Sequence, residues 1–125
     1  MPTREQRLSG LKILVVEDEF LVSMVLEDDL RDAGASVVGP FSDLAAALDG
    51  AGSQAFDLAL LDINLSGTMV YPLADALLAR HVPFLFLSGY TGADLPLRFA
   101  AHRRLSKPYD PRRLVEEILK LTPHP

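Results

Sequence analysis

The chain has 125 residues, of which 49% are hydrophobic, and a formal net charge of −5. This length suits one compact domain with its own core and leaves no room for a second folded domain. The absence of cysteine excludes a disulfide framework, thiol catalysis and thiolate metal sites, and favours a reducing compartment, by default the cytoplasm. The acidic total, with no lysine- or arginine-rich stripe beyond Arg103-Arg104, argues against direct nucleic-acid binding.

The polar N-terminal residues 1–10 are expected to form a disordered tail ahead of one domain that spans 11–121. They contain no apolar segment that could act as a signal peptide, and no later apolar run reaches membrane-spanning length. Residues 122–125 form a short C-terminal tail, with no output domain expected after it. The sequence therefore predicts a soluble protein without a membrane partner.

Five apolar runs of strand length occur along the chain and do not alternate with polar residues. Continuous apolarity is typical of strands that are buried on both faces, as in a parallel sheet covered by helices. The runs lie at 12–16, 37–41, 58–62, 84–88 and, more weakly, 104–107.

Helical patterns fill the intervals between these runs. After the first helix, Gly34 suits a left-handed cap, and Ser42 is the predicted N-cap of a short alanine-rich helix. Gly92 and Pro96 disfavour a long helix before the last strand. The predicted helices span 19–33, 42–50, 72–80 and 110–121, with about two further turns within 91–102.

Strands that alternate with helices predict a doubly wound α/β domain, because parallel neighbours need crossover connections. We expect five parallel strands flanked by five helices. In such sheets, the functional crevice lies beyond the carboxyl ends of the strands. Five polar or charged residues fall at those ends: Glu17, Asp18, Asp62, Ser88 and Lys107.

Each of these residues also has a structural interpretation when taken alone. Asp62 could cap the turn after its strand, and Glu17 and Asp18 could interact with the dipole of the next helix. Ser88 could be a turn residue and Lys107 a solvated charge. Three carboxylates in one crevice, however, repel one another and resist full ionisation unless a cation neutralises them.

The joint pattern predicts a site for Mg²⁺, with Mn²⁺ as the alternative, because a small hard cation prefers oxygen ligands and keeps several waters. A carboxylate such as Asp62 beside a divalent cation can accept a phosphoryl group. The Ser88 hydroxyl can then bind a phosphoryl oxygen, and the Lys107 ammonium can neutralise phosphoryl charge. The three histidines show no metal-ligand spacing and are interpreted as surface residues.

In their order along the chain, these residues resemble the receiver domain of two-component response regulators. The family pattern is an acidic pair after the first strand, an aspartate ending the third, Ser or Thr ending the fourth, and Lys-Pro after the fifth. The resemblance covers about residues 11–121. It implies a flavodoxin-like fold with strand order 2-1-3-4-5 and a cis bond between Lys107 and Pro108.

The resemblance implies a role for each residue of the site. Asp62 resembles the phosphoacceptor, and Glu17 and Asp18 resemble the metal-binding acids. Asn64 matches the residue that offers its backbone carbonyl to Mg²⁺. The remaining two matches are a switch hydroxyl and a phosphate-contacting lysine, at Ser88 and Lys107.

The resemblance also implies a signalling protein that is not a conventional enzyme. Such a domain catalyses only its own phosphorylation and dephosphorylation. Its phosphoryl group comes from a histidine kinase, a phosphotransfer protein or a small phosphodonor. The added charge then shifts an equilibrium between two surfaces, and the signal leaves through protein contacts or a phosphorelay.

Two positions depart from the family pattern. Arg104 stands where many receivers carry a Tyr or Phe whose ring moves inward on activation, so the switch or partner surface is assigned instead to Arg104, Tyr90 and Tyr109. Ser66-Gly67 lie after the acceptor where many receivers have proline. This second departure predicts a mobile loop before the third helix.

Segments 62–67, 70–72 and 86–90, together with Arg104, resemble the FAT GUY subgroup of single-domain receivers. That subgroup is associated with alphaproteobacterial signalling and often with histidine kinases of the HWE type. The resemblance therefore implies an HWE-type kinase as the phosphodonor, whereas the downstream protein partner stays open.

Three other functions remain as alternatives to this interpretation. A haloacid dehalogenase-type phosphatase also uses a strand-end aspartate, but its acid two residues later is replaced here by Asn64, which cannot act as a general acid or base. A receiver-like adaptor would bind its partner whether or not Asp62 is phosphorylated. A flavodoxin-like cofactor binder is disfavoured because the loop after the first strand is acidic, whereas phosphate-cradling loops favour glycine and exposed N–H groups.

Overall fold

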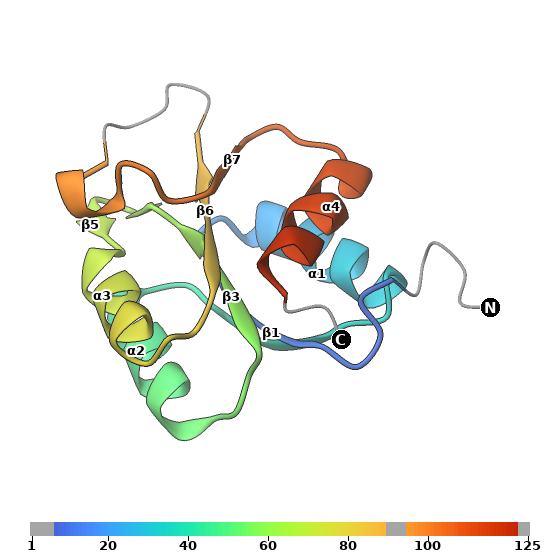
Figure 1. Cartoon of the computed structure of the whole chain (residues 1–125), viewed down its shortest axis with the longest axis horizontal. Coiled ribbons are helices and arrows are strands. Elements are labelled where there is room, and N and C mark those ends of the chain that lie inside the picture. The colour runs from blue at the N-terminus through green and yellow to red at the C-terminus, as the bar shows by residue number, and fades with distance from the viewer. Residues whose placement is uncertain (1–6, 90–94, 123–125) are drawn as a thin grey trace.

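The computed structural model describes residues 7–89 and 95–122, in which strands and helices alternate (Figure 1). The strands are β1 (Lys12–Val16), β2 (Ser36–Phe41), β3 (Leu58–Asp62), β4 (Asn64–Leu65), β5 (Thr68–Met69), β6 (Phe84–Ser88) and β7 (Arg104–Ser106). The helices are α1 (Phe20–Asp32), α2 (Leu44–Ser53), α3 (Tyr71–Ala79) and α4 (Pro111–Leu121), with a 3-10 helix η2 (Leu97–Phe99).

The main sheet has five parallel strands in the order β2-β1-β3-β6-β7. The short strands β4 and β5 pair with each other in a separate antiparallel sheet. When these two are left out of the count, the order is the predicted 2-1-3-4-5. The order along the chain reverses between β1 and β3, which places the crevice of a doubly wound fold at the carboxyl ends of these two strands.

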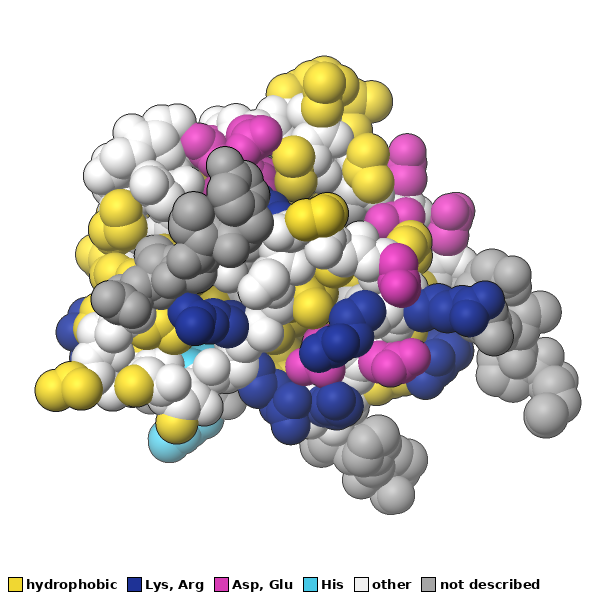
Figure 2. Space-filling view, turned by 90° about the horizontal axis from the view of Figure 1, so that it is seen from above, with side chains coloured by type: hydrophobic (Ala, Val, Ile, Leu, Met, Phe, Trp, Pro, Cys, Tyr) yellow, Lys and Arg dark blue, Asp and Glu magenta, His cyan; other side chains and the backbone are white. Residues whose placement is uncertain are grey.

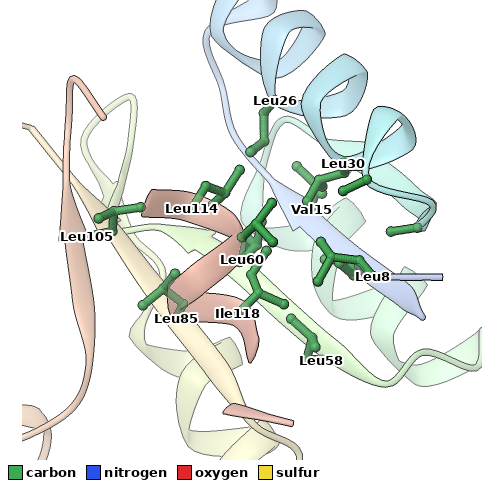
Figure 3. Close-up of a cluster of buried hydrophobic side chains, with 14 of the residues drawn as sticks. Leu8, Val15, Leu26, Leu30, Leu58, Leu60, Leu85, Leu105, Leu114 and Ile118 are labelled. Carbon is green, nitrogen blue, oxygen red and sulfur yellow. The ribbon is translucent and has the colours of Figure 1, made fainter. Parts of the chain in front are cut away.

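Helices cover both faces of the sheet, with α1 and α4 on one face and α2 and α3 on the other (Figure 1). All five residues of β3 are buried. They alternate between two cores: Leu58 and Leu60 face α1 and α4, whereas Ala59 and Leu61 face α2 and α3. The first core is shown in Figure 3. Burial on both faces explains why the predicted strands read as continuous apolar runs.

The second core contains a cluster of aromatic rings. Phe84 and Phe86 meet edge to face, and Phe99 of η2 packs against both. The interpretation of His102 as a surface residue is wrong: its ring stacks on Phe84 with centroids 4.0 Å apart, and its Nε2 lies 2.9 Å from the Phe84 carbonyl oxygen. Tyr71 completes the cluster by stacking on Phe99.

The second helix differs from its prediction at both ends. Asp43, not Ser42, is the N-cap, because its Oδ1 accepts the Ala46 N–H at 2.8 Å. At the other end, the helix continues past Gly50 to Ser53. A side chain at Gly50 would collide with the Phe41 ring, so this glycine serves close packing rather than helix termination.

The prediction of five helices is also wrong, since the described residues contain four α-helices. Within 95–102 the chain forms only the 3-10 helix η2, which follows Pro96. Proline has no N–H to donate and disfavours a helical conformation in the residue before it. The other predicted residues, 90–94, lie outside the described part of the chain.

The described end of the predicted N-terminal tail is ordered. Residues 7–10 form a turn, Leu8 is fully buried in the first core, and its N–H donates to the Ala33 carbonyl at 2.8 Å. The predicted left-handed cap is confirmed, because Gly34 has a φ of 96°. Among the described residues, no helix is long and apolar enough to cross a membrane.

Two glycines of α2 offer a matched test of this packing. Gly50→Ala is expected to lower the free energy of unfolding by roughly 1–2 kcal/mol, because the new methyl group overpacks the Phe41 ring. Gly52→Ala meets no atom within 4 Å and should raise it by about 0.5–1 kcal/mol through helix propensity. Urea unfolding measures the free energy of unfolding of both variants. Equal stabilisation by the two substitutions would contradict the packing argument.

Candidate functional site

The carboxyl ends of β1 and β3 bring together the three acids expected to converge. Glu17 and Asp18 directly follow β1, and Asp62 is the last residue of β3. One carboxylate oxygen from each lies within 4.8 Å of the others. Glu17 and Asp62 are only 2% and 7% exposed, whereas Asp18 is partly exposed. Two buried carboxylates and a third, partly exposed one therefore lie together at the carboxyl ends of two neighbouring strands.

Lys107 supplies a cation from the segment that follows β7. Its N–H donates to the Ser88 carbonyl at 2.8 Å, and its bond to Pro108 is cis, as the resemblance implies. Its Nζ donates to Glu17 Oε1 and lies 3.6 Å from Asp62 Oδ1. Three carboxylates and one ammonium give the site a formal charge of −2.

These charges strongly perturb the pKa of Asp62. Burial raises it, the negative charge of Glu17 raises it further, and together they outweigh Lys107, so that the pKa is about 8. Burial lowers the pKa of Lys107, but the Glu17 hydrogen bond and the charge of Asp62 more than offset this, so the net change is upward. The prediction that the clustered acids resist full ionisation is confirmed for Asp62.

Ser88 ends β6 beside these charges, and its side chain is buried at 2% exposure. Its Oγ has no hydrogen-bond partner within the described part of the protein. A buried hydroxyl without a partner is costly, and in a native protein it calls for an explanation such as a ligand group. Ser88 lines a cavity of about 370 Å³ together with Asp18, Asp62, Asn64 and Lys107.

The segment after Asp62, which the sequence predicts to be a mobile loop, forms a hairpin. Strands β4 and β5 pair Asn64 with Met69 and Leu65 with Thr68. Ser66 and Gly67 form the two-residue turn, with φ of 53° and 95°. Two successive left-handed residues match the twist of a tight hairpin, and a Ser-Gly pair is a known turn signal.

Sequence reasoning missed the contact that this hairpin makes with the acidic site. Ser66 Oγ donates to Asp18 Oδ2 at 2.6 Å. Burial raises the pKa of Asp18, but hydrogen bonds, of which the one from Ser66 is the largest, bring it below its usual value. The side-chain oxygen of Asn64 accepts the Gly67 N–H at 2.6 Å, and Asn64 also lines the cavity.

Of the residues assigned to a switch or partner surface, Arg104 and Tyr109 do not line the acidic cavity. Tyr90 falls outside the described residues. Arg104 is exposed on β7 and lines a separate cleft of about 570 Å³ between β7 and α4. Tyr109 is half-buried, and burial followed by the negative charge of Glu17 raises its pKa.

An apolar groove of about 560 Å³ runs along α1 and adjoins the acidic cavity. Glu19, Gly89 and Lys107 line both. The helix exposes large hydrophobic side chains, with Phe20 and Leu21 at 73% and 74% exposure. Figure 2 shows one cluster of acidic side chains with hydrophobic side chains beside it near the top of the view, and further acidic side chains interspersed with lysines and arginines lower on the same face.

Comparison with known proteins agrees with this geometry. Residues 13–119 match the family model of the response regulator receiver domain. SdrG of Sphingomonas melonis Fr1 has 36% identity and a TM-score of 0.81, covering 89% of this chain and 95% of that chain. The BeF3-activated conformation of SdrG from Pseudomonas melonis Fr1 has 35% identity and a TM-score of 0.76, covering 90% and 97%.

A curated relative is the uncharacterized transcriptional regulatory protein YbdJ of Bacillus subtilis, at 28% identity over 123 residues. The match covers 94% of this chain but 53% of YbdJ, so the chain spans about half the length of that relative.

The electrostatics of the site predict that Asp62→Asn stabilises the metal-free protein. Since the pKa of Asp62 is about 8 in the folded chain and about 4 when unfolded, the wild type loses stability relative to the variant as pH rises between those values. We expect a difference of roughly 1–3 kcal/mol at pH 8, measured by urea unfolding in EDTA. A difference that stays constant from pH 4 to pH 8 would contradict this assignment.

Proposed function

The chain belongs to the response regulator receiver domain family, and we propose that it accepts a phosphoryl group on Asp62 and signals through the protein contacts that this modification alters. The observation that carries the proposal is the unpartnered, buried Ser88 hydroxyl, which lines the same cavity as Asp62 and Lys107. A phosphoryl group on Asp62 supplies oxygen acceptors for both the hydroxyl and the ammonium.

The proposed reaction transfers the group from a phosphohistidine. A carboxylate oxygen of Asp62 attacks phosphorus, the new O–P bond forms, and the P–N bond breaks with its electron pair passing to the imidazole nitrogen. Lys107, 3.6 Å from Asp62, neutralises the phosphoryl charge, while the Ser88 hydroxyl donates to a phosphoryl oxygen. Water later attacks phosphorus, releasing inorganic phosphate and restoring the carboxylate.

Receiver domains bind Mg²⁺ at an acidic pocket, and the donor set here suits that ion. Glu17, Asp18 and Asp62 offer hard carboxylate oxygens, and the formal charge of −2 matches a divalent cation. We assign them to Mg²⁺, or Mn²⁺, together with the backbone carbonyl of Asn64. When bound, the ion supplies charge neutralisation for the transferring phosphoryl group.

The apolar groove along α1 is proposed to receive the phosphodonor protein. A donor histidine has to reach Asp62 through the acidic cavity, and the groove adjoins that cavity through Glu19 and Lys107. Exposed hydrophobic side chains beside a reactive site favour a protein surface as the occupant. The donor is assigned as a histidine kinase or a phosphotransfer protein.

We further propose that the chain belongs to the FAT GUY subgroup of receivers and that its phosphodonor is a histidine kinase of the HWE type. Its support is the sequence pattern of segments 62–67, 70–72 and 86–90 together with Arg104 on β7. An exposed Arg104 in place of an inward-moving ring means that activation must reach the surface by another route.

Phosphorylation is tested with acetyl phosphate and Mg²⁺, read by intact mass. The wild type should gain one phosphoryl group, EDTA should abolish the gain, and Asp62→Asn should remove it. Asp75→Asn is the matched control, because Asp75 is paired with Arg98 on the surface and should leave labelling intact. No Mg²⁺-dependent adduct in the wild type would refute the proposal.

The same substitution separates this function from a receiver-like adaptor. If Asp62 is the phosphoacceptor, Asp62→Asn should abolish the change in partner binding that acetyl phosphate produces in the wild type. An adaptor would bind its partner equally in both proteins and under both conditions.

Donor docking is tested by comparing two sources of the phosphoryl group. Leu21→Asp should slow transfer from a phosphorylated histidine kinase by about tenfold or more, because it places a charge in the apolar contact. Labelling by acetyl phosphate should be unchanged. Leu48→Asp, which alters an exposed leucine of α2 on the opposite face of the sheet, is the control.

If Leu21→Asp slows both phosphodonors alike, the groove acts on the chemistry and not on docking. If it slows neither, the donor protein does not use α1.

A further inference from the structure

The backbone fixes the position of Ser66 beside the acidic site. Its hairpin is anchored on both sides, because Leu65 is buried in the second core and the Val70 N–H donates to the Ile63 carbonyl at 2.9 Å. The turn itself is tight, since Ser66 and Gly67 are its only two residues and both have left-handed φ angles. Ser66 therefore presents its hydroxyl from a short turn that is anchored on both sides.

A serine at this position is conformationally unfavourable. Glycine adopts a φ of 53° at no steric cost, whereas a residue with a Cβ is disfavoured there. Such residues persist where the surrounding structure compensates for them, and they occur often at functional sites. The compensating interaction here is the 2.6 Å hydrogen bond from Ser66 Oγ to Asp18 Oδ2, which joins residues 48 positions apart.

Asp18 is the member of the acidic cluster that most needs such a partner. Glu17 is already oriented, because its two carboxylate oxygens accept from Lys107 Nζ and from the Glu19 N–H. Asp62 is buried at the end of a central strand. Asp18 is partly exposed and lies beyond β1, so its side chain has more freedom to lose when it binds a cation.

We propose that Ser66 is a positioning residue for the divalent cation, whose hydroxyl orients the Asp18 carboxylate so that its other oxygen points into the cavity. The inference rests on the metal site of the proposed function. Hydrogen bonds of this kind to metal-binding carboxylates fix their orientation and raise the affinity for the metal. Ser66 thus links the shape of the β4-β5 hairpin to the strength of cation binding.

The test is isothermal titration of the unphosphorylated protein with Mg²⁺, repeated with Mn²⁺. Ser66→Gly removes the hydroxyl and suits the backbone, while Ser66→Ala removes the hydroxyl and keeps the Cβ. Both should weaken ion binding by roughly tenfold. Ser66→Asn, which tolerates a left-handed φ and offers an N–H donor, should restore part of the affinity. Ser53→Ala removes a serine hydroxyl bonded to the Asp49 carbonyl in α2 and should bind as the wild type does.

Thermal unfolding in EDTA and in Mg²⁺ separates positioning from a purely structural role. Positioning predicts that the stabilisation gained on adding Mg²⁺ shrinks in Ser66→Gly and Ser66→Ala. If both variants melt lower in EDTA but keep the wild-type dissociation constant, the hydroxyl only supports the hairpin and the inference is overturned.

Mg²⁺ binding and Asp62 labelling of the wild type separate failure of this inference from failure of the proposed function. A wild type that binds Mg²⁺ and is labelled on Asp62, with unchanged affinity in the Ser66 variants, overturns this inference alone. A wild type that binds neither ion overturns both the metal assignment and the role of Ser66.

Discussion

Electrostatic repulsion among Glu17, Asp18 and Asp62 is the constraint on which the site depends. The parallel sheet makes it unavoidable, because β1 and β3 are neighbours and both end at this edge. One ammonium, from Lys107, offsets only part of the charge and leaves the site at −2. Burial and the negative charge of Glu17 together raise the pKa of Asp62 to about 8. A divalent cation relieves the repulsion, and so does a proton, which makes metal binding and protonation competing ways to stabilise one arrangement.

Most of the fold could be predicted from the continuous apolar runs, because such runs indicate strands that are buried on both faces of a sheet. The apolar runs at β1, β3 and β6 are continuous because their residues alternate between two cores that are both hydrophobic and buried. Features set by single tertiary contacts could not be predicted. Gly50 was interpreted as a helix end because the sequence does not show that the Phe41 ring lies over it. Leu8 was placed in a tail because one buried leucine among polar residues has no periodicity.

In the candidate site, too, the features that follow from strand positions could be predicted, whereas those set by single tertiary contacts could not. The convergence of Asp62 with Glu17 and Asp18 followed from strand ends alone, and the structure brings all three together. The contact of Ser66 with Asp18 was missed, since it depends on a hairpin turn whose direction cannot be deduced from the spacing of residues. His102 was misinterpreted for a similar reason: its ring stacks on Phe84, 18 positions away, and nothing in the local sequence predicts that.

The residues that follow β7 connect the site to two parts of the surface. Lys107 lines the acidic cavity, while Pro108 and Tyr109 line both the groove along α1 and the cleft between β7 and α4. A phosphoryl group on Asp62 would draw on the ammonium that now donates to Glu17. If a resulting shift of Lys107 extended to its backbone, it would reach Pro108 and Tyr109 and thereby both surfaces. Three consecutive residues thus join the surroundings of Asp62 to the exterior, and no aromatic ring at the position of Arg104 is part of that connection.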